Sequence, residues 1–558
     1  MEILHFENIS FTYPNSDSKA VDNFSLSVKS GEFVVICGKS GCGKTTLLKL
    51  IKKELTPHGH LNGEILYKGM PITELEPNVS AREIGFVKQD PDSQLVTDKV
   101  WHELAFGLEN LNVPPSAMRL RIGEISDYFG INEWFYRDVN TLSGGQKQLV
   151  NLAAAMIMQP ELLLLDEPTS QLDPVAAADF ISILEKLNKE LGVTIIIAEH
   201  RLEELFPIAD RIVLMDSGRI LINSDPRGFG EKVKDLDEEY SRMLPSAIRI
   251  FNGVKVKAPC PLTVKEAREF VNANFKNDIK EYVPPEQKAA GNTALRLEDV
   301  WFRYERDSQD VLKGLKLTLE YGELFCVLGA NGSGKTTMLN VAAGLDLPYK
   351  GQVFLEEKKI NKKNFESFRT RIAYLPQNPQ LMFVKDSIAD DFFYMLNTLG
   401  LASDKAKELV ETVAGKVGIN DLLDKHPYDL SLGQLQKCAL AKLLLQRPKI
   451  LLLDEPTMGL DAIFKRVLAD ILINIKTEDA AVLMVTHDIE FAAENADRCA
   501  LIFDGGIISS GTPEDFFSNN YFYTTAANRI SRNIYKGAIT CEQVIEMCLK
   551  NGVRDEKD

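Results

Sequence analysis

Two copies of one glycine-rich pattern contain the residues best suited to chemistry in this sequence. Gly-x-x-x-x-Gly-Lys-Thr occurs at residues 38–45 and again at 329–336. Each copy follows a short apolar run, at 33–37 or 324–328, and precedes a stretch of helical character. The backbone amides of such a loop converge on phosphate oxygens, and the start of the following helix adds positive potential. Both loops are therefore predicted to bind the phosphates of a nucleotide.

The loop residues divide into phosphate contacts and metal contacts. Lys44 and Lys335 are expected to reach the β- and γ-phosphates, and the hydroxyls of Thr45 and Thr336 to ligate Mg²⁺. A helix N-terminus lowers a thiol pKa, so Cys42 is either a reactive site or, more simply, a small filler residue. The other predicted nucleotide contacts are Gly38, Lys39, Ser40, Gly41, Cys42, Gly43, Thr46, Gly329, Ala330, Asn331, Gly332, Ser333, Gly334 and Thr337.

An acidic pair follows a later apolar run in each half of the chain. Asp166 and Asp454 end these runs, which aims their carboxylates at the predicted Mg²⁺. Glu167 and Glu455 come next and are placed to orient or deprotonate an attacking water. An isolated Asp-Glu pair would equally suit a helix N-cap followed by a first-turn acid. Beside two phosphate loops, the catalytic interpretation is favoured.

Histidine and glutamine residues recur at matched places in the two halves. His200 and His487 follow the next apolar run, where a histidine can hydrogen-bond the γ-phosphate and hold the neighbouring glutamate. A lone histidine at a strand end is more often structural, but the matched spacing favours the catalytic role. Gln89 and Gln377 precede Asp-Pro and Asn-Pro, which are loop-forming pairs. Each glutamine is predicted to contact Mg²⁺.

Two tyrosines keep the spacing of the phosphate loops. Tyr13 and Tyr304 each alternate with a phenylalanine, Phe11 or Phe302, so both rings of a pair are expected on one side of a strand. Stacking of the tyrosine on adenine is one interpretation. Plain packing in the core is the other, and the sequence leaves both open.

The positions of these residues show that the chain is an internal repeat. The separation between Lys44 and Lys335 is almost the same as the separation between the two acidic pairs, the two glutamines and the two histidines. Segments 246–267 and 528–544, which follow the chemistry-bearing parts, are also alike. A nearly constant offset over so many landmarks indicates a duplicated domain, each copy ending in a small helical appendix.

The secondary structure expected around the loops is of one type. Short runs that are apolar on both faces are predicted to be buried strands of a parallel sheet. Helical stretches at 46–51 and 337–342 follow the phosphate loops, and alternation of strands and helices predicts an α/β fold. The predicted strands outside the phosphate loops are 162–165, 194–198, 450–453 and 482–485.

Bulk composition limits the possible functions. A chain of 558 residues is expected to form at least two domains. The formal net charge of −16 counts against nucleic acid as the main partner. Eight scattered cysteines without a Cys-x-x-Cys pair suggest reduced thiols rather than a metal cluster. No apolar run approaches the roughly 18 residues that span a bilayer, and the N-terminus lacks a secretory pattern, so a cytosolic protein is expected.

One further motif gives the sequence a family likeness. Leu-Ser-Gly-Gly-Gln at 142–146, lying between a phosphate loop and Leu-Leu-Leu-Leu-Asp-Glu, resembles the signature of the ATP-binding-cassette ATPases. The resemblance covers nearly the whole chain, twice. It implies two tandem P-loop cassettes of α/β class. Each would have a mainly parallel sheet core, an antiparallel β subdomain, a helical signature subdomain and a small C-terminal appendix.

The resemblance also implies how the two halves share their sites. In this family two cassettes pair head-to-tail, here within one chain, and each ATP lies between one phosphate loop and the opposite signature. Asp173 and Asp461 match the loop that links the two sites. The signature residues implied to contact the opposite ATP are Ser143, Gly144, Gly145, Gln146, Ser431, Gly433 and Gln434.

The implied domain bounds follow from the repeat. The first cassette is predicted at 1–228 and its appendix at 229–276. A linker at 277–294 contains Pro284-Pro285 and Gly291. The second cassette is predicted at 295–515 and its appendix at 516–558.

The second signature departs from the family pattern. It has the sequence Leu-Ser-Leu-Gly-Gln at 430–434, with Leu432 in place of a glycine. Leucine resists positive φ and would place an isobutyl group beside the nucleotide of the Lys44 site. Unequal sites, with the Lys335 site the stronger hydrolyser, are therefore one hypothesis. Simple tolerance of the leucine is the other, because Glu167 and Glu455 are both present.

Finer features resemble the energy-coupling-factor branch of the family. Gln-Asp-Pro-Asp-Ser-Gln-Leu-Val-Thr at 89–97, Glu-Leu-Ala-Phe-Gly-Leu-Glu-Asn at 103–110 and the Thr-His-Asp-Ile-Glu run from residue 486 are similar to that branch. The likeness implies a motor at the cytoplasmic face of the cell membrane. It would drive import of a vitamin, vitamin precursor or transition metal ion with a transmembrane T component and a small substrate-capturing S component. The alternative is a soluble twin-cassette ATPase acting on ribosomes or nucleic acid.

Overall fold

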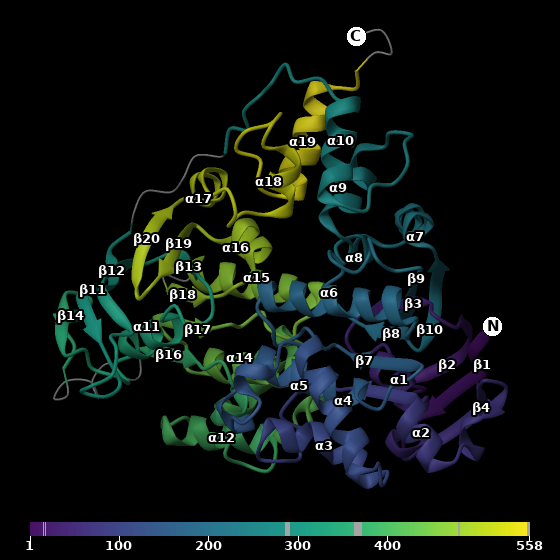
Figure 1. The fold of residues 1–558 in the computed structure, drawn as a ribbon. Coiled ribbons are helices and arrows are strands. Elements are labelled where there is room, and N and C mark those ends of the chain that lie inside the picture. Colours follow the sequence, from purple (N-terminus) through teal and green to yellow (C-terminus); the bar gives the residue numbers. More distant parts are fainter. Residues whose placement is uncertain (15, 17, 285–290, 362–370, 478–479, 555–558) are drawn as a thin grey trace. The chain divides into compact units, whose positions relative to one another are not determined.

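The computed structural model describes residues 1–14, 16, 18–284, 291–361, 371–477 and 480–554. It forms two compact units, Met1–Ala267 and Arg268–Asp558, and the division falls inside one helix (Figure 1). Each unit contains one copy of the repeat. Part of the predicted linker, residues 285–290, lies outside the described residues.

The first unit contains two sheets. The smaller sheet is antiparallel, with the order β2-β1-β4-β5, and the larger has the order β10-β9-β3-β8-β7-β6. All neighbours in the larger sheet pair in parallel except β10, which is antiparallel to β9. The strands are β1 (Glu2–Thr12), β2 (Val21–Lys29), β3 (Phe33–Gly38), β4 (His60–Tyr67), β5 (Met70–Pro71), β6 (Ile84–Val87), β7 (Leu162–Asp166), β8 (Thr194–Ala198), β9 (Arg211–Asp216) and β10 (Arg219–Ser224).

The helix that follows the first phosphate loop is α1, Lys44–Leu50. Its apolar residues Leu47, Leu48 and Leu50 are buried in a core cluster to which strands of both sheets contribute. The helix is therefore held between the antiparallel sheet and the parallel sheet. The other helices of this unit are α2 (Pro77–Glu83), α3 (Val100–Asn110), α4 (Pro115–Tyr128), α5 (Gly144–Met156), α6 (Pro174–Leu191), α7 (Pro226–Lys232), α8 (Glu238–Ser241), α9 (Ser246–Val254) and, at the division between the units, α10 (Val264–Asn274).

The second unit repeats the arrangement of the two sheets. Its antiparallel sheet has the order β12-β11-β14-β15, and its larger sheet has the order β16-β17-β18-β13-β19-β20. The predicted parallel core is confirmed in both units. The strands are β11 (Thr293–Phe302), β12 (Leu312–Glu320), β13 (Leu324–Leu328), β14 (Lys350–Leu355), β15 (Lys358–Lys359), β16 (Ile372–Leu375), β17 (Ile450–Asp454), β18 (Ala481–Val485), β19 (Arg498–Phe503) and β20 (Gly506–Gly511).

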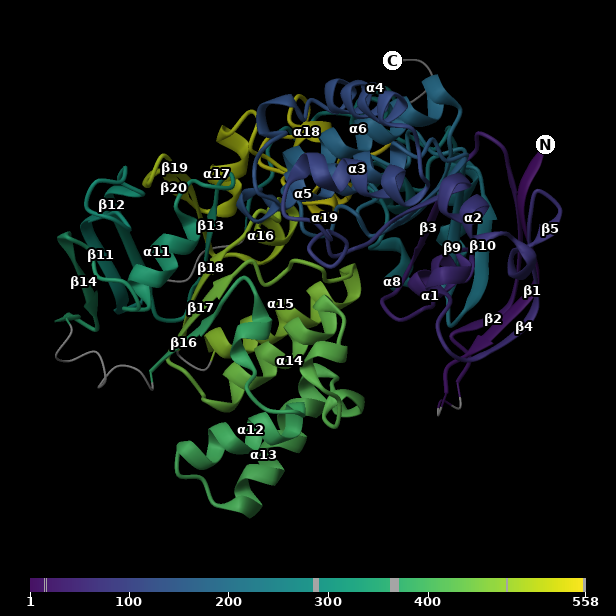
Figure 2. The ribbon, with the colours of Figure 1, turned by 60° about the horizontal axis from the view of Figure 1, so that its bottom comes forward.

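Helices cover both faces of the larger sheet of the second unit. One face packs on α11, the helix after the second phosphate loop, and the other packs on a cluster to which α12, α13, α14 and α15 contribute. Figure 2 shows α12, α13 and α14 gathered as one helical layer. The helices are α11 (Lys335–Ala342), α12 (Ile388–Thr398), α13 (Ser403–Val417), α14 (Leu432–Leu445), α15 (Ala462–Thr477), α16 (Ile489–Asn495), α17 (Pro513–Asn519), α18 (Ala526–Ser531) and α19 (Cys541–Asn551).

Within the second unit, the chain before β11 is tied to the end of the chain. The amide of Lys276 donates to the carbonyl of Gly552 at 3.1 Å, and the amide of Tyr282 donates to the carbonyl of Lys536 at 2.8 Å. The side chain of Asn551 hydrogen-bonds both the amide and the carbonyl of Ile279, at 2.7 and 3.1 Å. Residues 268–276, which the sequence places in the first appendix, thus lie in the second unit.

Candidate nucleotide site

The predicted site residues of each unit follow three neighbouring parallel strands. β8 lies between β3 and β7, with Asp166 of β7 level with Ala198 of β8. Carboxyl ends of parallel strands meet at one edge of a sheet, so the phosphate loop, the acidic pair and His200 meet there. The second unit has the same arrangement at β13, β18 and β17, where Asp454 is level with Val485.

The phosphate loops require glycine where the helix begins. Gly43 and Gly334 are the N-cap residues of α1 and α11, with φ values of 103° and 100°. A Cβ on Gly43 would lie 2.2 Å from the carbonyl oxygen of Ala20, and one on Gly334 would lie 3.0 Å from that of Val311. Positive φ and close backbone together exclude a side chain at these positions. The remaining predicted loop contacts lie between the strand and the helix, at 39–42 and 329–333.

Both loop lysines are buried with their amines directed into the loop. Lys44 is only 4 % exposed and Lys335 only 6 %. The Nζ of Lys44 donates to the carbonyl oxygens of Gly38 and Lys39 at 3.0 and 3.1 Å. Lys335 repeats the pattern with Gly329 and Ala330, at 2.9 and 3.1 Å. Each ammonium group therefore lies inside its phosphate loop, held by the loop's own carbonyl oxygens.

The glutamate of the first acidic pair is held from three sides. Glu167 Oε1 lies 2.8 Å from His200 Nε2 and 3.8 Å from Lys44 Nζ. Gln89 Nε2 donates to Glu167 Oε2 at 2.8 Å. The backbone of Glu167 has φ of 44°, an uncommon value for a residue with a side chain. This conformation turns the carboxylate toward the phosphate loop.

The glutamate of the second pair is held differently. Glu455 also has positive φ, 51°, and its Oε2 accepts from the backbone amide of His487 at 3.1 Å. The ring of His487 approaches Oε2 through Nδ1, at 2.8 Å, whereas His200 uses Nε2. Gln377 is exposed, in contrast to the half-buried Gln89. The two sites therefore share their residues but differ in local geometry.

The aspartates have the properties of metal ligands. Burial raises the pKa of both Asp166 and Asp454 to about 6, with the adjacent glutamates adding to the rise. Thr45 Oγ1 donates to Asp166 Oδ1 at 2.9 Å. Thr336 lies beside Asp454 and opposes part of the rise in its pKa. Buried carboxylate oxygens beside a threonine hydroxyl are the hard oxygen ligands that Mg²⁺ takes together with nucleotide phosphates, so the residues fit that ion.

The two tyrosines are not core residues. Tyr13 is 38 % exposed and Tyr304 is 60 % exposed, and each lies just beyond the end of its strand. Their hydroxyls are hydrogen-bonded to Thr46 and Thr337, at 3.0 and 2.9 Å. Both rings thus stand beside the phosphate-loop helix, partly exposed, and each packs edge-to-face with the ring of Phe11 or Phe302. Of the two interpretations that the sequence left open, core packing is wrong.

The signature segments begin helices α5 and α14 as capping boxes. Ser143 Oγ accepts from the amide of Gln146 at 3.3 Å, and Gln146 Oε1 accepts from the amide of Ser143 at 3.0 Å. Ser431 and Gln434 form the same pair, at 3.3 and 3.1 Å. The glutamine oxygens are therefore occupied within their own helix. The serines remain exposed at the helix start.

The expectation that Leu432 is placed under backbone strain is wrong. Leu432 is the first residue of α14, and neither it nor Gly144 is among the residues with positive φ. The helical conformation suits leucine. The space beside the next residue of the signature also differs between the units. A Cβ on Gly433 would lie 2.8 Å from the carbonyl oxygen of Gly459, whereas a Cβ on Gly145 would lie 3.4 Å from the Cβ of Ala176.

The aspartates of the linking loops cap helices. Asp173 Oδ1 accepts from the amide of Ala176 at 2.9 Å, and Asp461 Oδ1 accepts from that of Phe464 at 2.7 Å. In the first unit, a buried glutamate that the sequence analysis missed also supports this loop. Glu199 accepts from the amide of Thr169 at 2.9 Å and from that of His200 at 2.8 Å. Its counterpart in the second half is a threonine, so no repeat drew attention to it.

Comparison with known proteins assigns the chain to a family. The family described as ABC transporter matches residues 21–170 and 312–458. An ABC transporter ATP-binding protein of Bacillus thuringiensis subsp. konkukian is 40% identical over 541 residues, which cover 97% of each chain. This chain belongs to the ABC transporter ATP-binding proteins. As an ABC ATPase, it binds and hydrolyses ATP.

Other similar proteins extend over different shares of this ABC ATPase. A protein of Bacillus subtilis (strain 168) named as the HMP/thiamine import ATP-binding protein YkoD is 32% identical over 561 residues, covering 100% of this chain and 98% of that protein. The solved structure of cbiO1 from Clostridium perfringens, described as part of the ABC transporter complex cbiONQ, is 28% identical. It covers 41% of this chain and 92% of its own, with a TM-score of 0.38.

Two residues of the first phosphate loop of this ABC ATPase have surroundings that the structure makes clear. Cys42 is 4 % exposed, and burial raises its pKa, so of the two roles considered the simpler one, a small filler residue, is favoured over a reactive thiol. Lys39 is paired with Glu239 of α8 at 2.6 Å, and its amine lies 4.9 Å from the centre of the Tyr240 ring. No sequence pattern connected α8 with the phosphate loop.

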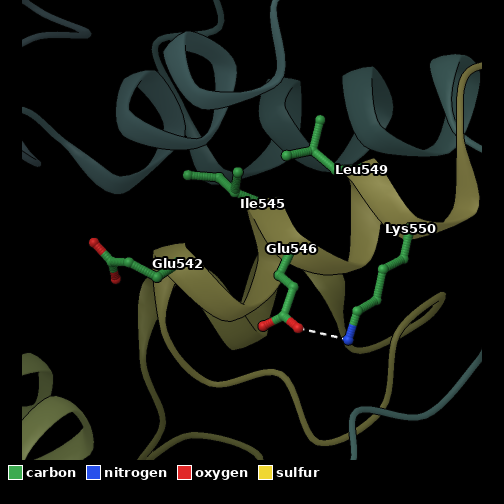
Figure 3. A pocket seen from close by; sticks show the side chains of 5 residues that line it. All are labelled: Glu542, Ile545, Glu546, Leu549 and Lys550. Carbon is green, nitrogen blue, oxygen red and sulfur yellow. Dashed lines mark ion pairs between the residues drawn. The ribbon is translucent and has the colours of Figure 1, made fainter.

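A hollow lies on helix α19 of the ABC ATPase, outside the predicted site residues. It is lined by Glu542, Ile545, Glu546, Leu549 and Lys550, all from α19. Figure 3 shows Ile545 and Leu549 on one side of the helix and the Glu546–Lys550 ion pair, of 2.5 Å, on another. None of the predicted site residues contributes to it.

Among the described residues, every helix is too short or too polar to traverse a bilayer.

Proposed function

We propose that this chain is the ATP-hydrolysing motor subunit of an energy-coupling-factor-type importer of a micronutrient: a vitamin, a vitamin precursor or a transition metal ion. The observation that carries the proposal is the full-length likeness to the HMP/thiamine import ATP-binding protein of Bacillus subtilis. Two complete sets of site residues in one chain support it, since both Glu167 and Glu455 are present and oriented.

The residues of each site have distinct roles in the proposed reaction. In the first site, Glu167 orients a water and takes its proton as the water oxygen bonds to the γ-phosphorus. The bond from that phosphorus to the bridging oxygen breaks, and its electron pair leaves with ADP. His200 and Gln89 fix the carboxylate, and Lys44 and the loop amides hold the phosphate oxygens. The counterparts in the second site are Glu455, His487, Gln377, Lys335 and the second loop.

The metal and adenine contacts belong to the same proposal. Mg²⁺, held by Thr45, Asp166 and Gln89 or by their counterparts Thr336, Asp454 and Gln377, would stabilise the negative charge of the phosphates. The exposed rings of Tyr13 and Tyr304 are proposed to stack on adenine. The raised pKa values of Asp166 and Asp454 favour the proposed Mg²⁺ contacts, because a buried carboxylate with too little counter-charge is stabilised by a cation.

Pairing of the two halves in one chain is proposed to complete both sites. The exposed starts of α5 and α14 would each face the phosphate loop of the other half, with Ser143 and Ser431 nearest the γ-phosphate. ATP then favours the paired state and hydrolysis releases it, so the chain acts as a two-state switch. The proposed cassettes are 1–228 and 295–515, and the proposed appendices are 229–276 and 516–558, joined by 277–294.

The proposed partners are a transmembrane T component and a small, apolar S component at the cytoplasmic face of the cell membrane. The test is affinity purification of the full chain from detergent-solubilised membranes of its own cell, with a Glu167→Gln/Glu455→Gln chain as a trapped-state comparison. Recovery of one integral T-like protein and one small integral protein is expected. Recovery of ribosomes or nucleic acid in place of integral proteins would refute the importer assignment and support the soluble twin-cassette alternative.

A further inference from the structure

A glutamate stands three residues after the site histidine in both halves of the chain. The first half has His200-Arg-Leu-Glu203 and the second has His487-Asp-Ile-Glu490. Nothing in the proposed reaction uses either glutamate. In each unit, however, the carboxylate of this glutamate accepts a hydrogen bond from the first residue of a helix in the C-terminal appendix.

In the first unit, Glu203 caps helix α9. Its Oε1 accepts from both the amide and the hydroxyl of Ser246, each at 2.7 Å. Ser246 is only 3 % exposed and is the first residue of the helix. The N-cap residue is Pro245, whose side chain has no acceptor, so the carboxylate supplies the hydrogen bond that a polar N-cap would normally make. A negative charge at a helix N-terminus is also favoured by the helix dipole.

In the second unit, Glu490 makes the same contact with helix α18. Its Oε1 accepts from the amide of Ala526, the first residue of that helix, at 2.8 Å. Here the N-cap residue Thr525 has its own side-chain acceptor, which serves the amide of Asn528 at 3.0 Å. The helix would therefore be capped without Glu490. Capping alone accounts less well for the second contact than for the first, yet the contact is kept.

The chain between each histidine and its glutamate has little freedom to absorb movement. In the first unit, Glu199 accepts from the amide of His200, and Arg201 Nη1 donates to the carbonyl of Leu172 at 3.0 Å. In the second unit, Asp488 caps α16 through the amide of Phe491 and pairs with Lys465 at 2.6 Å. These contacts hold the residues between each histidine and its glutamate in defined positions.

We propose that Glu203 and Glu490 are positioning residues that join the histidine segment of each site to the appendix helix of the same unit. The position of the appendix then sets how firmly His200 or His487 holds its glutamate. By reciprocity, nucleotide at the site changes the stability of the start of α9 or α18. The inference rests on the proposed role of the histidines in hydrolysis.

The test uses the full chain with Glu455→Gln, so that turnover is measured at the first site. Glu203→Ala is expected to lower kcat about five- to tenfold with little change in KM for ATP, because the phosphate loop is untouched. Glu203→Gln keeps an acceptor oxygen and should restore most of the turnover. Glu204→Ala, at an exposed neighbour, is the matched control and should have no effect. Glu490→Ala in a Glu167→Gln chain repeats the test on the second unit.

Hydrogen exchange distinguishes coupling from a merely structural cap. In the chain with native Glu203, Mg²⁺ with a non-hydrolysable ATP analogue should change the exchange of the amides at the start of α9, and Glu203→Ala should abolish that change. If those amides do not respond to the analogue, or Glu203→Ala keeps full turnover while His200→Ala loses it, this inference alone is wrong. Full turnover in His200→Ala would refute the proposed histidine role and the inference with it.

Discussion

The two halves of the chain place a large side chain at different positions: in the second half it lies in the signature, and in the first half it lies in the loop after the catalytic glutamate. The first half combines Gly144 with Gln171, and the second half combines Leu432 with Gly459 at the corresponding positions. A Cβ on Gly459 would lie 3.0 Å from Leu432 Cδ2 and 3.3 Å from its Cγ. Gly459 has φ of +71°. With leucine at position 432, a side chain at position 459 is therefore expected to be destabilising.

The geometry gives the size of the effect. For Gly459→Ala, the left-handed backbone costs about 1–2 kcal/mol. Overpacking against Leu432 adds about 1–3 kcal/mol. The total is about 2–5 kcal/mol. In a Leu432→Ala chain the overpacking is relieved and only the backbone cost remains, so a double-mutant cycle should show a coupling of about 1–3 kcal/mol between the two residues.

The assay is calorimetric unfolding of the full chain, in which the midpoint of the transition that Gly459→Ala lowers is followed. A loss of 1 kcal/mol lowers the midpoint of a domain of this size by about 2 °C, so Gly459→Ala should lower it by roughly 4–10 °C. Gly144→Ala is the control, since its Cβ would lie 3.9 Å from the Gln171 carbonyl. An equal effect of Gly459→Ala with leucine or alanine at 432 would refute the reasoning.

Three further predictions concern the reacting groups. Glu455→Gln should lower total ATP turnover more than Glu167→Gln if the sites are unequal; equal losses would contradict this. Asp166→Asn should stabilise the nucleotide-free chain at pH 7 by up to about 3 kcal/mol while abolishing turnover at its site, because a carboxyl whose pKa is raised from 3.8 to about 6 is costly when ionised. The carboxyl binds its proton more tightly when folded, so thermal unfolding should show this advantage fading as pH falls from 6 to 4. Ser431→Ala should lower turnover in a Glu455→Gln chain but not in a Glu167→Gln chain, with Ser143→Ala giving the opposite result; identical losses in both chains would contradict pairing of the halves.

Much of the fold and the placement of the site could be predicted because the chemistry constrains the backbone. A phosphate loop needs a strand before it and a helix after it. The motifs at Lys44 and Lys335 therefore predict the strands β3 and β13 and the helices α1 and α11. Short apolar runs such as 162–165, ending in an acidic pair, favour buried central strands, and the structure has a strand there. The acidic pairs and histidines then followed, since neighbouring strands end at the same edge of the sheet.

What the sequence analysis missed depends on contacts between distant segments. Lys39 pairs with Glu239 of α8, and nothing local to either residue indicates that contact. The distance from Gly459 to Leu432 is set by how the loop after Glu455 packs on the start of α14. The contact between the two positions could therefore be recognised only with the structure. The role of Gln146 is different, because Ser-x-x-Gln before an apolar run is a recognised capping signal that the family likeness obscured.

The tie between residues 274–282 and residues 551–554 has a practical consequence for any attempt to produce the second half alone. A fragment cut at the boundary that the repeat suggests, near residue 295, would lack the strand-like partner of Gly552, Val553 and Arg554 and would expose their polar backbone. A fragment that starts at Arg268 retains it. During synthesis the same tie cannot form until residues 551–554 have been made, so residues 274–282 stay without these partners while the second cassette is being synthesised.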